Sequence, residues 1–474
     1  MTGPRMLIFA YASFHAFVVP HFTWGVDSYV IFRYGMLVYM KVYSFPRGGL
    51  SFEDPTVPPR NSSVVAFLPA FSVIPLIQYP GGRTEPLVSV GDSVREGMLI
   101  GRGKGPDSAN IHATVPGKVV RIAAWKDNDG RLHEALIIRL EGAFECLGKK
   151  TENYLCEGIS HQELLKLFDD YGIVEMEESG RPLSSMLAEL GARKNPQTLV
   201  VRCVFDDPWL AADYAVCRER FQAVAGGSAI IAKSGGRIRR IVFAVSHKEK
   251  EIGEAMLAET ARYDIPASVA LTGSRYPQRN RRELELVLRE YEKKENIDLG
   301  VLLILGPATL AAAYDAVKYH RPILDRYVAV GGSALRTPQV MRVRIGKRIG
   351  DLFEECGGFV DFPHNVATGS PLSGRPVLNL DEPVTKTTCA VFAMKKAQAG
   401  NDMKQDCISC GECRSVCPVG LDPEELYKRV IVLHSGRGPG ADECHGCGCC
   451  EVVCPSRLPL SGVILGNIVP GGSE

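Results

Sequence analysis

The sequence lacks both an excess of charge of one sign and a long apolar run. Its 55 Lys and Arg residues balance 54 Asp and Glu residues, which leaves a formal net charge of +1. Because nucleic-acid-binding surfaces need clustered positive charge, and no basic stripe is present, we expect no nucleic acid as a partner. A transmembrane helix needs about 20 consecutive apolar residues. The nearest candidate, residues 6–19, is shorter and ends at Pro20, so the sequence gives no sign of a membrane-spanning helix.

Residues 1–39 also lack the small-residue cleavage site of a secretory signal peptide. They are rich in aromatic residues, but they carry Asp27 and Arg33. We expect this extension not to be part of the folded protein, with translation beginning at Met40. A peripheral membrane anchor is the alternative.

The cysteines are distributed unevenly. Nine of the 15 fall between residues 407 and 454, and the other six are scattered singly. A disulfide framework would instead spread cysteines through a small secreted domain. The cluster of cysteines therefore indicates metal ligands in a reducing compartment, and the scattered six are predicted to be core residues.

Two copies of the pattern C-x2-C-x2-C-x3-C-P begin at Cys407 and Cys444. Three cysteines at this spacing hold one iron–sulfur cubane, and in two-cluster ferredoxins the fourth cysteine ligates the other cluster. The pattern therefore predicts two [4Fe–4S] clusters with crossed ligation. The predicted ligands are Cys407, Cys410, Cys413 and Cys454 for cluster 1, and Cys417, Cys444, Cys447 and Cys450 for cluster 2.

Zinc is the competing interpretation, since structural zinc sites also use pairs of cysteines. A zinc site needs four ligands, and two runs of four that each end in Cys-Pro exceed that need. Cys449 is surplus to the cluster spacing, and we interpret it as a small buried residue. His445 also lies off the ligand spacing and is interpreted as a loop residue.

The whole chain predicts a multidomain protein of α/β and α+β class. Residues 40–150 contain short β-like runs with glycine turns, as at Gly91, and resemble the barrel-sandwich fold of biotinyl and lipoyl carriers. In residues 158–322, apolar strands alternate with helical stretches, which predicts a Rossmann-like domain with a largely parallel sheet. Residues 323–376 predict a small β-grasp-like unit, and residues 377–466 a ferredoxin-like α-helical domain that holds both clusters.

This order of parts resembles the C subunit of the Rnf ion-translocating electron transport complex. The resemblance covers residues 40–466. It is carried by both cysteine motifs and by residues 45–49, 275–278 and 384–386, which read F-P-R-G-G, R-Y-P-Q and V-T-K. The α/β domain is similar to the flavin-binding NADH subunit of respiratory complex I.

The resemblance implies a peripheral subunit on the cytoplasmic face of the cell (inner) membrane, bound to the membrane subunits of a translocase. It implies that the complex moves electrons between reduced ferredoxin and NAD and couples this transfer to the transport of Na⁺ or H⁺. It also implies an FMN site in the α/β domain, which would face NAD(H).

The sequence departs from the family at this FMN site. The family's flavin loop reads like G-I-V-G-x-G-G-A-x-F-P-T, whereas residues 172–182 read G-I-V-E-M-E-E-S-G-R-P. A phosphate cradle needs small residues and free backbone N–H groups, and glutamates oppose a phosphate with like charge. Residues 201–208 and 279–281 also depart from the family's flavin and nucleotide motifs. The residues of this degenerate loop that we single out are Gly172, Glu175, Glu177, Glu178 and Gly180.

Three functions follow from these features. The first is an iron–sulfur electron-transfer subunit of a membrane-bound Rnf-type complex, with a degenerate FMN/NAD site and a ferredoxin or flavodoxin as redox partner. FMN is a doubtful cofactor in this interpretation. The second is an intact NADH dehydrogenase subunit with FMN in a reshaped pocket. The third is a soluble iron–sulfur reductase subunit, or an adaptor that docks a partner.

Overall fold

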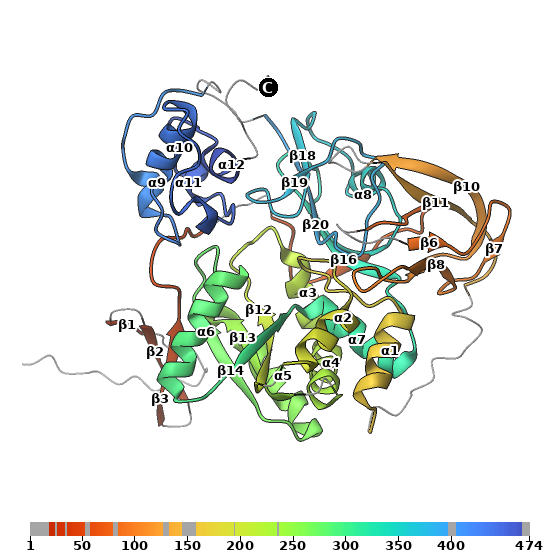
Figure 1. The fold of residues 1–474 in the computed structure, drawn as a ribbon, viewed down its shortest axis with the longest axis horizontal. Coiled ribbons are helices and arrows are strands. Elements are labelled where there is room, and N and C mark those ends of the chain that lie inside the picture. The colour runs from red at the N-terminus through yellow and green to blue at the C-terminus, as the bar shows by residue number, and fades with distance from the viewer. Residues whose placement is uncertain are drawn as a thin grey trace, which may run out of the picture.

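The computed structural model describes residues 19–23, 26–33, 36–52, 57–78, 84–126, 132–144, 158–193, 195–234, 237–396 and 404–466. Figure 1 shows an α/β unit in green, a β-rich unit in orange and cyan, and a small helical unit in blue at the end of the chain. In these described ranges, no helix is both long enough and apolar enough to cross a bilayer.

Two facing antiparallel sheets form the first unit. One has the order β5-β11-β10-β7 and the other the order β6-β8-β9. Apolar residues of both sheets, among them Ile74, Ile100 and Leu136, pack in one buried cluster between them. This arrangement is a sandwich, as residues 40–150 predict. The strands are β5 (Phe71–Pro75), β6 (Thr84–Pro86), β7 (Ser93–Val94), β8 (Leu99–Gly103), β9 (Ile111–His112), β10 (Gly117–Lys126) and β11 (Leu132–Leu140).

A parallel sheet of order β14-β13-β12-β15 forms the centre of the second unit. The central parts of its strands are mostly apolar because both faces are covered by helices. Leu199 and Val201 face the larger cluster on one side, and Val200 faces the smaller cluster on the other. The strands are β12 (Gln197–Cys203), β13 (Ile238–Ser246), β14 (Ala267–Thr272) and β15 (Val301–Leu305).

Helix α6 (Arg281–Glu295) packs in the smaller cluster, and the other helices of this unit contribute to the larger one. These other helices are α1 (His161–Asp170), α2 (Leu183–Gly191), α3 (Ala211–Glu219), α4 (Phe221–Ser234), α5 (Lys250–Thr260) and α7 (Pro307–Tyr319). The short 3₁₀ helices η1 (His247–Glu249) and η2 (Ala261–Tyr263) flank α5.

Three antiparallel strands near the start of the chain extend this sheet. They are β1 (Val19–Thr23), β2 (Val26–Arg33) and β3 (Met36–Tyr43). Their link to the parallel strands is a single pair, Tyr43 with Thr272, and Tyr43 lies after Met40. Residues 1–18 lie outside the described residues, and the expectation that residues 1–39 are not part of the fold stays a prediction.

A six-stranded sheet of order β19-β18-β20-β16-β17-β4 forms the third unit. Strand β20 lies near the middle of this sheet, although the sequence predicts residues 377–466 as one cluster domain. Strand β4 lies at its edge, although it falls in the range predicted as barrel. The sheet therefore extends past both predicted boundaries, since strand pairing depends on distant partners. The elements are β4 (Ser63–Val65), β16 (Asp325–Gly331), β17 (Gln339–Arg344), α8 (Ile349–Glu355), β18 (Asn365–Thr368), β19 (Arg375–Pro376) and β20 (Ala390–Met394).

The last unit is helical, and between residues 404 and 466 the structure shows no strand. Its elements are short because two ligand loops interrupt them. They are α9 (Glu412–Ser415), α10 (Pro423–Ile431), η3 (Ala441–Glu443), α11 (Cys449–Val452) and α12 (Leu460–Leu465).

Candidate functional site

The cysteines of the two motifs line two separate cavities. The first cavity is lined by Cys407, Cys410, Cys413 and Cys454. The second is lined by Cys417, Cys444, Cys447 and Cys450, together with Cys449. Each cavity thus combines three cysteines of one motif with the fourth cysteine of the other. These are the two sets that the spacing predicts, and their role as cluster ligands stays a prediction.

The two motifs repeat the same backbone turn. Gly411 and Gly448 have φ of 77° and 76° and directly precede the four-residue helices α9 and α11. A side chain at this φ would strain the backbone, so glycine is required for the chain to curl around each cavity. Backbone amides close to the cysteines also donate hydrogen bonds to sulfur. The backbone N–H of Leu421 donates to Cys417 Sγ at 3.3 Å, and the amide of Gly446 donates to the Cys444 thiol. Such donors stabilise thiolates and the clusters that they bind.

The arrangement of the cysteines also bears on the zinc alternative. Over the described ranges, no three His, Cys, Asp or Glu side chains converge closely enough to hold one metal ion. The eight cysteines instead surround two openings. A cubane separates its ligands across four irons, so this arrangement is compatible with the cluster prediction.

The two cavities differ in how the rest of the chain covers them. Tyr276 of the α/β unit donates its hydroxyl to the backbone carbonyl of Cys447 at 2.8 Å, and the Gly49 amide donates to the Val416 carbonyl at 2.9 Å. By contrast, Cys410 is exposed, and its neighbour Ile408 is 65% exposed. The loops of the second cavity therefore contact the α/β unit, whereas at the first cavity one cysteine is exposed.

The segment that is predicted to be a degenerate flavin loop, residues 172–182, connects α1 to α2. It begins at a junction of three units, because Lys386 Nζ donates to the carbonyls of Gly172 and Asn110, each at 2.8 Å. Burial lowers the pKa of Lys386 to about 7. Gly172 has φ of 60°, and an added Cβ there would lie 2.1 Å from the Asn110 carbonyl oxygen. The start of the loop therefore requires glycine.

The carboxylate of Glu175 binds the backbone of its own loop. It accepts the N–H groups of Glu177 at 3.0 Å, Glu178 at 3.1 Å and Ser179 at 2.5 Å, and the Ser179 hydroxyl at 2.8 Å. Burial raises the pKa of Glu175, but the Ser179 amide and the charge of Arg202 outweigh burial and hold it below its ordinary value. A ring of backbone amides of this kind is an anion-binding nest, and here the anion is the protein's own side chain.

Glu177 caps helix α7 from the same loop. Its Oε1 accepts the backbone N–H of Ala308 at 2.9 Å and of Thr309 at 3.1 Å. An added Cβ at Gly306 would lie 2.2 Å from Glu177 Cδ, so only glycine leaves room for this contact. Burial, with the nearby charge of Glu175, raises the pKa of Glu177 to about 7. The amides at the start of α7, which are the usual anion donors of a helix, are therefore already occupied.

The three segments that are predicted to depart from the family meet in one network of charged side chains, in which Arg202 and Arg279 are buried and Glu178 is 48% exposed. Arg202 forms an ion pair with Glu178, and it also donates to the carbonyl of Arg279 at 3.4 Å. The Arg279 amide donates to Asp206 at 3.1 Å, and its guanidinium pairs with Asp213 at 3.1 Å. Burial raises the pKa of Asp206 to about 7, although Arg279 opposes the rise. Arg202 therefore pairs with a carboxylate of residues 172–182, and Arg279 pairs with a carboxylate of α3.

The sequence does not predict which residues bind these glutamate and arginine side chains. Asp213 and Thr309 are distant from the flavin loop along the chain, and no local pattern marks them. The spacing of the second motif predicts Cys449 as a small buried residue. It is buried, but it also lines the second cavity.

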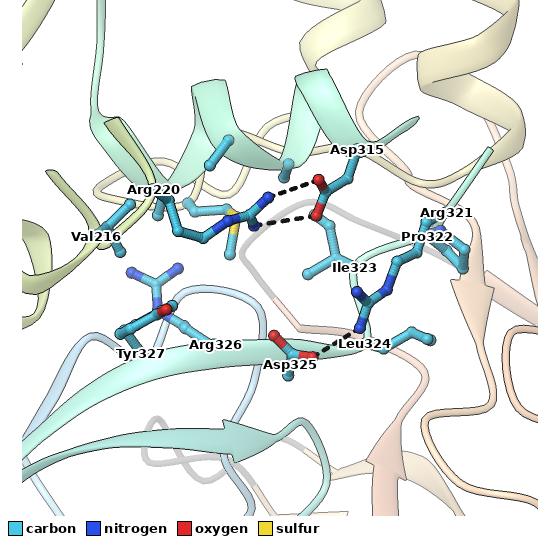
Figure 2. Close-up of a pocket in the computed structure, with 14 residues that line it drawn as sticks. Val216, Arg220, Asp315, Arg321, Pro322, Ile323, Leu324, Asp325, Arg326 and Tyr327 are labelled. Atoms are coloured by element: carbon cyan, nitrogen blue, oxygen red, sulfur yellow. Dashed lines mark hydrogen bonds and ion pairs between the residues drawn. The ribbon is translucent and has the colours of Figure 1, made fainter. Parts of the chain in front are cut away.

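A neighbouring cavity is too small to hold a flavin. It lies between α7 and β16, has a volume of about 40 Å³, and is lined by paired charges (Figure 2). Arg220 binds Asp315 at 2.6 and 3.0 Å, and Arg321 binds Asp325 at 3.0 Å. Ligand pockets for molecules of this size are roughly 300 Å³ or more, so this cavity has room for water only.

Comparison with known proteins agrees with this division of the chain. The family model described as "RnfC Barrel sandwich hybrid domain" matches residues 47–143. The one described as "Nuo51 FMN-binding domain" matches residues 168–314. These matches confirm the predicted barrel-sandwich domain and the similarity of the α/β unit to a flavin-binding domain.

Three relatives are C subunits of ion-translocating complexes. The chain is 31% identical to the C subunit of the ion-translocating oxidoreductase complex of Rhodobacter capsulatus, over 79% of this chain and 72% of that one. It is 29% identical to the C subunit of the proton-translocating ferredoxin:NAD(+) oxidoreductase complex of Clostridium ljungdahlii, over 80% and 83%. It is 26% identical to the C subunit of the Na(+)-translocating ferredoxin:NAD(+) oxidoreductase complex of Acetobacterium woodii, over 75% and 80%. The predicted resemblance is confirmed, and the chain belongs to the RnfC family, the C subunits of the Rnf-type ion-translocating oxidoreductase complexes.

Proposed function

We propose that this subunit passes electrons through two [4Fe–4S] clusters and that its own FMN/NAD site binds neither flavin nor nucleotide. The claim that the site binds neither flavin nor nucleotide rests on the position of two carboxylates. Glu175 occupies the amides of the flavin loop, and Glu177 occupies those at the start of α7.

A phosphate would have to displace both side chains before it could bind. The displaced Glu175 carboxylate would lose its donors and would also repel the phosphate, by about 1 kcal/mol at a few ångströms in a wet site and more in a dry one. Glu177 would lose its donors as well. The pairing of Arg202 with Glu178 removes a cation that could offset this repulsion. Several such costs together correspond to a loss of a few factors of ten in affinity.

The two cavities lined by cysteines support the claim that electrons pass through two clusters. Cluster 1 would be held by Cys407, Cys410, Cys413 and Cys454, and cluster 2 by Cys417, Cys444, Cys447 and Cys450. Such clusters supply one-electron transfer. The backbone amides at the loops and the short helices of the last unit fit this role.

Without a flavin in this subunit, electrons enter and leave through other proteins. We propose the membrane subunits of the Rnf-type complex and a ferredoxin or flavodoxin as these partners. The subunit then lies peripherally on the cytoplasmic face of the membrane. In this arrangement the barrel and the α/β unit act as a scaffold that places the clusters, with residues 1–39 outside the fold.

One observation favours a second candidate function. The flavin-domain family model matches residues 168–314 throughout the degenerate segments. An intact NADH dehydrogenase subunit with FMN is therefore the alternative.

The flavin and iron content of the reconstituted protein separates the two candidates. Anaerobic reconstitution with iron, sulfide and FMN, followed by desalting, is expected to give about eight iron atoms and no flavin per chain. Stoichiometric flavin would favour the alternative, and about four iron atoms would contradict the two-cluster assignment.

A further inference from the structure

Glu283 is a buried carboxylate at the boundary between the α/β unit and the last unit. It lies in the first turn of α6, and its side chain is only 1% exposed. Neither of its carboxylate oxygens has a hydrogen-bond partner in another residue of the described ranges. A buried carboxylate without donors is costly, because its lost hydration is not replaced. A role other than stabilising the fold would account for a carboxylate at this position.

The ring of His445 lies beside this carboxylate. His445 Nε2 is 3.5 Å from Glu283 Oε1. His445 directly follows the predicted ligand Cys444, and it is among the residues that line the second cavity. Its side chain is 25% exposed, so most of it is covered by protein. A single histidine therefore adjoins both the second cavity and the buried carboxylate of the α/β unit.

Other contacts already hold the backbone of this loop. Arg282 pairs with the Glu443 carboxylate at 2.5 Å and donates to the Glu443 carbonyl at 3.2 Å. On the other side of the histidine, the Tyr276 hydroxyl donates to the Cys447 carbonyl at 2.8 Å. Because these contacts attach the loop to the α/β unit on both sides, attachment does not require Glu283. What Glu283 adds is a contact with one side chain.

The first cavity is built differently at the matching place. The residue of the first motif that matches His445 is Ile408, which also lines its cavity but is 65% exposed. Among the described residues, no histidine lines the first cavity, and the glutamate that does, Glu424, is paired with Lys428 at 2.6 Å. A ring held by a buried carboxylate is therefore a feature of the second cavity and not of the first.

We propose that Glu283 is a positioning residue that holds the His445 ring against the second cavity and so keeps water away from cluster 2. Reduction adds one negative charge to a cluster. Because water stabilises that charge, excluding water lowers the reduction potential. The carboxylate acts chiefly through the position of the ring and not through its own charge. This inference rests on the proposed function, because it requires a cluster in the second cavity.

The test measures the reduction potentials of both clusters in the reconstituted full chain, by redox titration followed by electron paramagnetic resonance, once Cys410→Ala has identified the cluster 1 signal. His445→Ala and Glu283→Ala are each expected to shift the cluster 2 potential to more positive values and to leave that of cluster 1 unchanged. Glu283→Gln keeps an acceptor beside the ring, so its shift is expected to be smaller than that of Glu283→Ala. The double variant Glu283→Ala/His445→Ala is expected to match His445→Ala alone, because no ring is left to hold.

Two controls are matched to these variants. Ile408→Ala changes the equivalent position of the first motif, and Glu285→Gln changes a glutamate of α6 that is 42% exposed and paired with Arg281. Neither is expected to move the cluster 2 potential.

An unchanged cluster 2 potential in His445→Ala would overturn the positioning role. Equal shifts in Glu283→Gln and Glu283→Ala, or a double variant whose shift is the sum of the two single shifts, would overturn it as well. If Glu283→Ala does not fold, a shift in His445→Ala that is larger than the shift in Glu283→Gln supports the role, and equal shifts contradict it. If the unsubstituted chain holds only about four iron atoms, the proposed function fails instead.

Discussion

Glu177 caps helix α7 at Thr309: its carboxylate accepts the Thr309 backbone N–H at 3.1 Å and the Thr309 hydroxyl at 2.5 Å. The start of a helix carries a partial positive charge and free amides, which is why it binds phosphates. In this chain an internal side chain occupies these amides, so the contact joins the fold of the α/β unit to its proposed loss of flavin.

The stability of the protein is expected to depend on the protonation of Glu177. Burial raises its pKa from 4.5 to about 7 in the folded state. The folded chain therefore holds a proton that the unfolded chain releases, and stability falls as the pH rises from about 4.5 to about 7. Glu177→Gln keeps an acceptor for the α7 amides and removes the titration, so thermal melting across this window should show a shallower fall.

The Glu177→Gln variant is expected to keep part of the fall in stability with pH, because burial raises the pKa of Asp206 to about 7 as well. Glu189→Gln is the control, since this glutamate is 59% exposed at the surface. An unchanged slope in Glu177→Gln would mean that Glu177 is ionised throughout.

Removal of the Glu175 side chain is expected to destabilise the chain by about 2–4 kcal/mol, because three backbone N–H groups lose their acceptor. Urea unfolding of Glu175→Ala measures this loss. Glu189→Ala breaks only an exposed ion pair with Arg181 and is expected to cost less than about 1 kcal/mol. Equal effects of the two substitutions would show that the Glu175 contacts contribute little.

Crossed ligation predicts which cluster each fourth cysteine supports. Cys410→Ala should remove the signal of cluster 1 and so identify it. Cys417→Ala, although it belongs to the same motif, should keep that signal and lose the other, because Cys417 lines the second cavity. Electron paramagnetic resonance of the two reduced variants provides the comparison, and loss of the same signal from both would refute crossed ligation.

A chain that begins at Met40 is expected to load as much iron as the full chain. The motivation is the family resemblance, which covers residues 40–466, and the single residue pair through which β3 meets β14. Iron analysis and association with membranes that contain the rest of the complex would test this. Loss of membrane association on removal of residues 1–39 would favour the anchor alternative.

The sequence predicts the features that depend on residues close to one another along the chain. The cysteines of each motif lie close together along the chain, and the alternation of strands and helices around β12 to β15 has a local period. The pairing of Glu177 with Thr309 joins residues 132 apart, and β20 pairs with β16 across the predicted domain boundary. Such contacts depend on how separate elements pack. The sequence therefore predicts that glutamates oppose a phosphate, but not that they bind the donors a phosphate would need.

The flavin site is proposed to be filled by the protein's own side chains. The most direct test is a titration of the anaerobically reconstituted full chain with FMN, in which the quenching of flavin fluorescence reports binding. We predict no saturable binding up to about 100 μM FMN, as expected when several kcal/mol of binding free energy are lost. Saturable binding with a Kd below that concentration, or bleaching of the cluster absorbance by NADH without an added flavoprotein, would contradict the proposal.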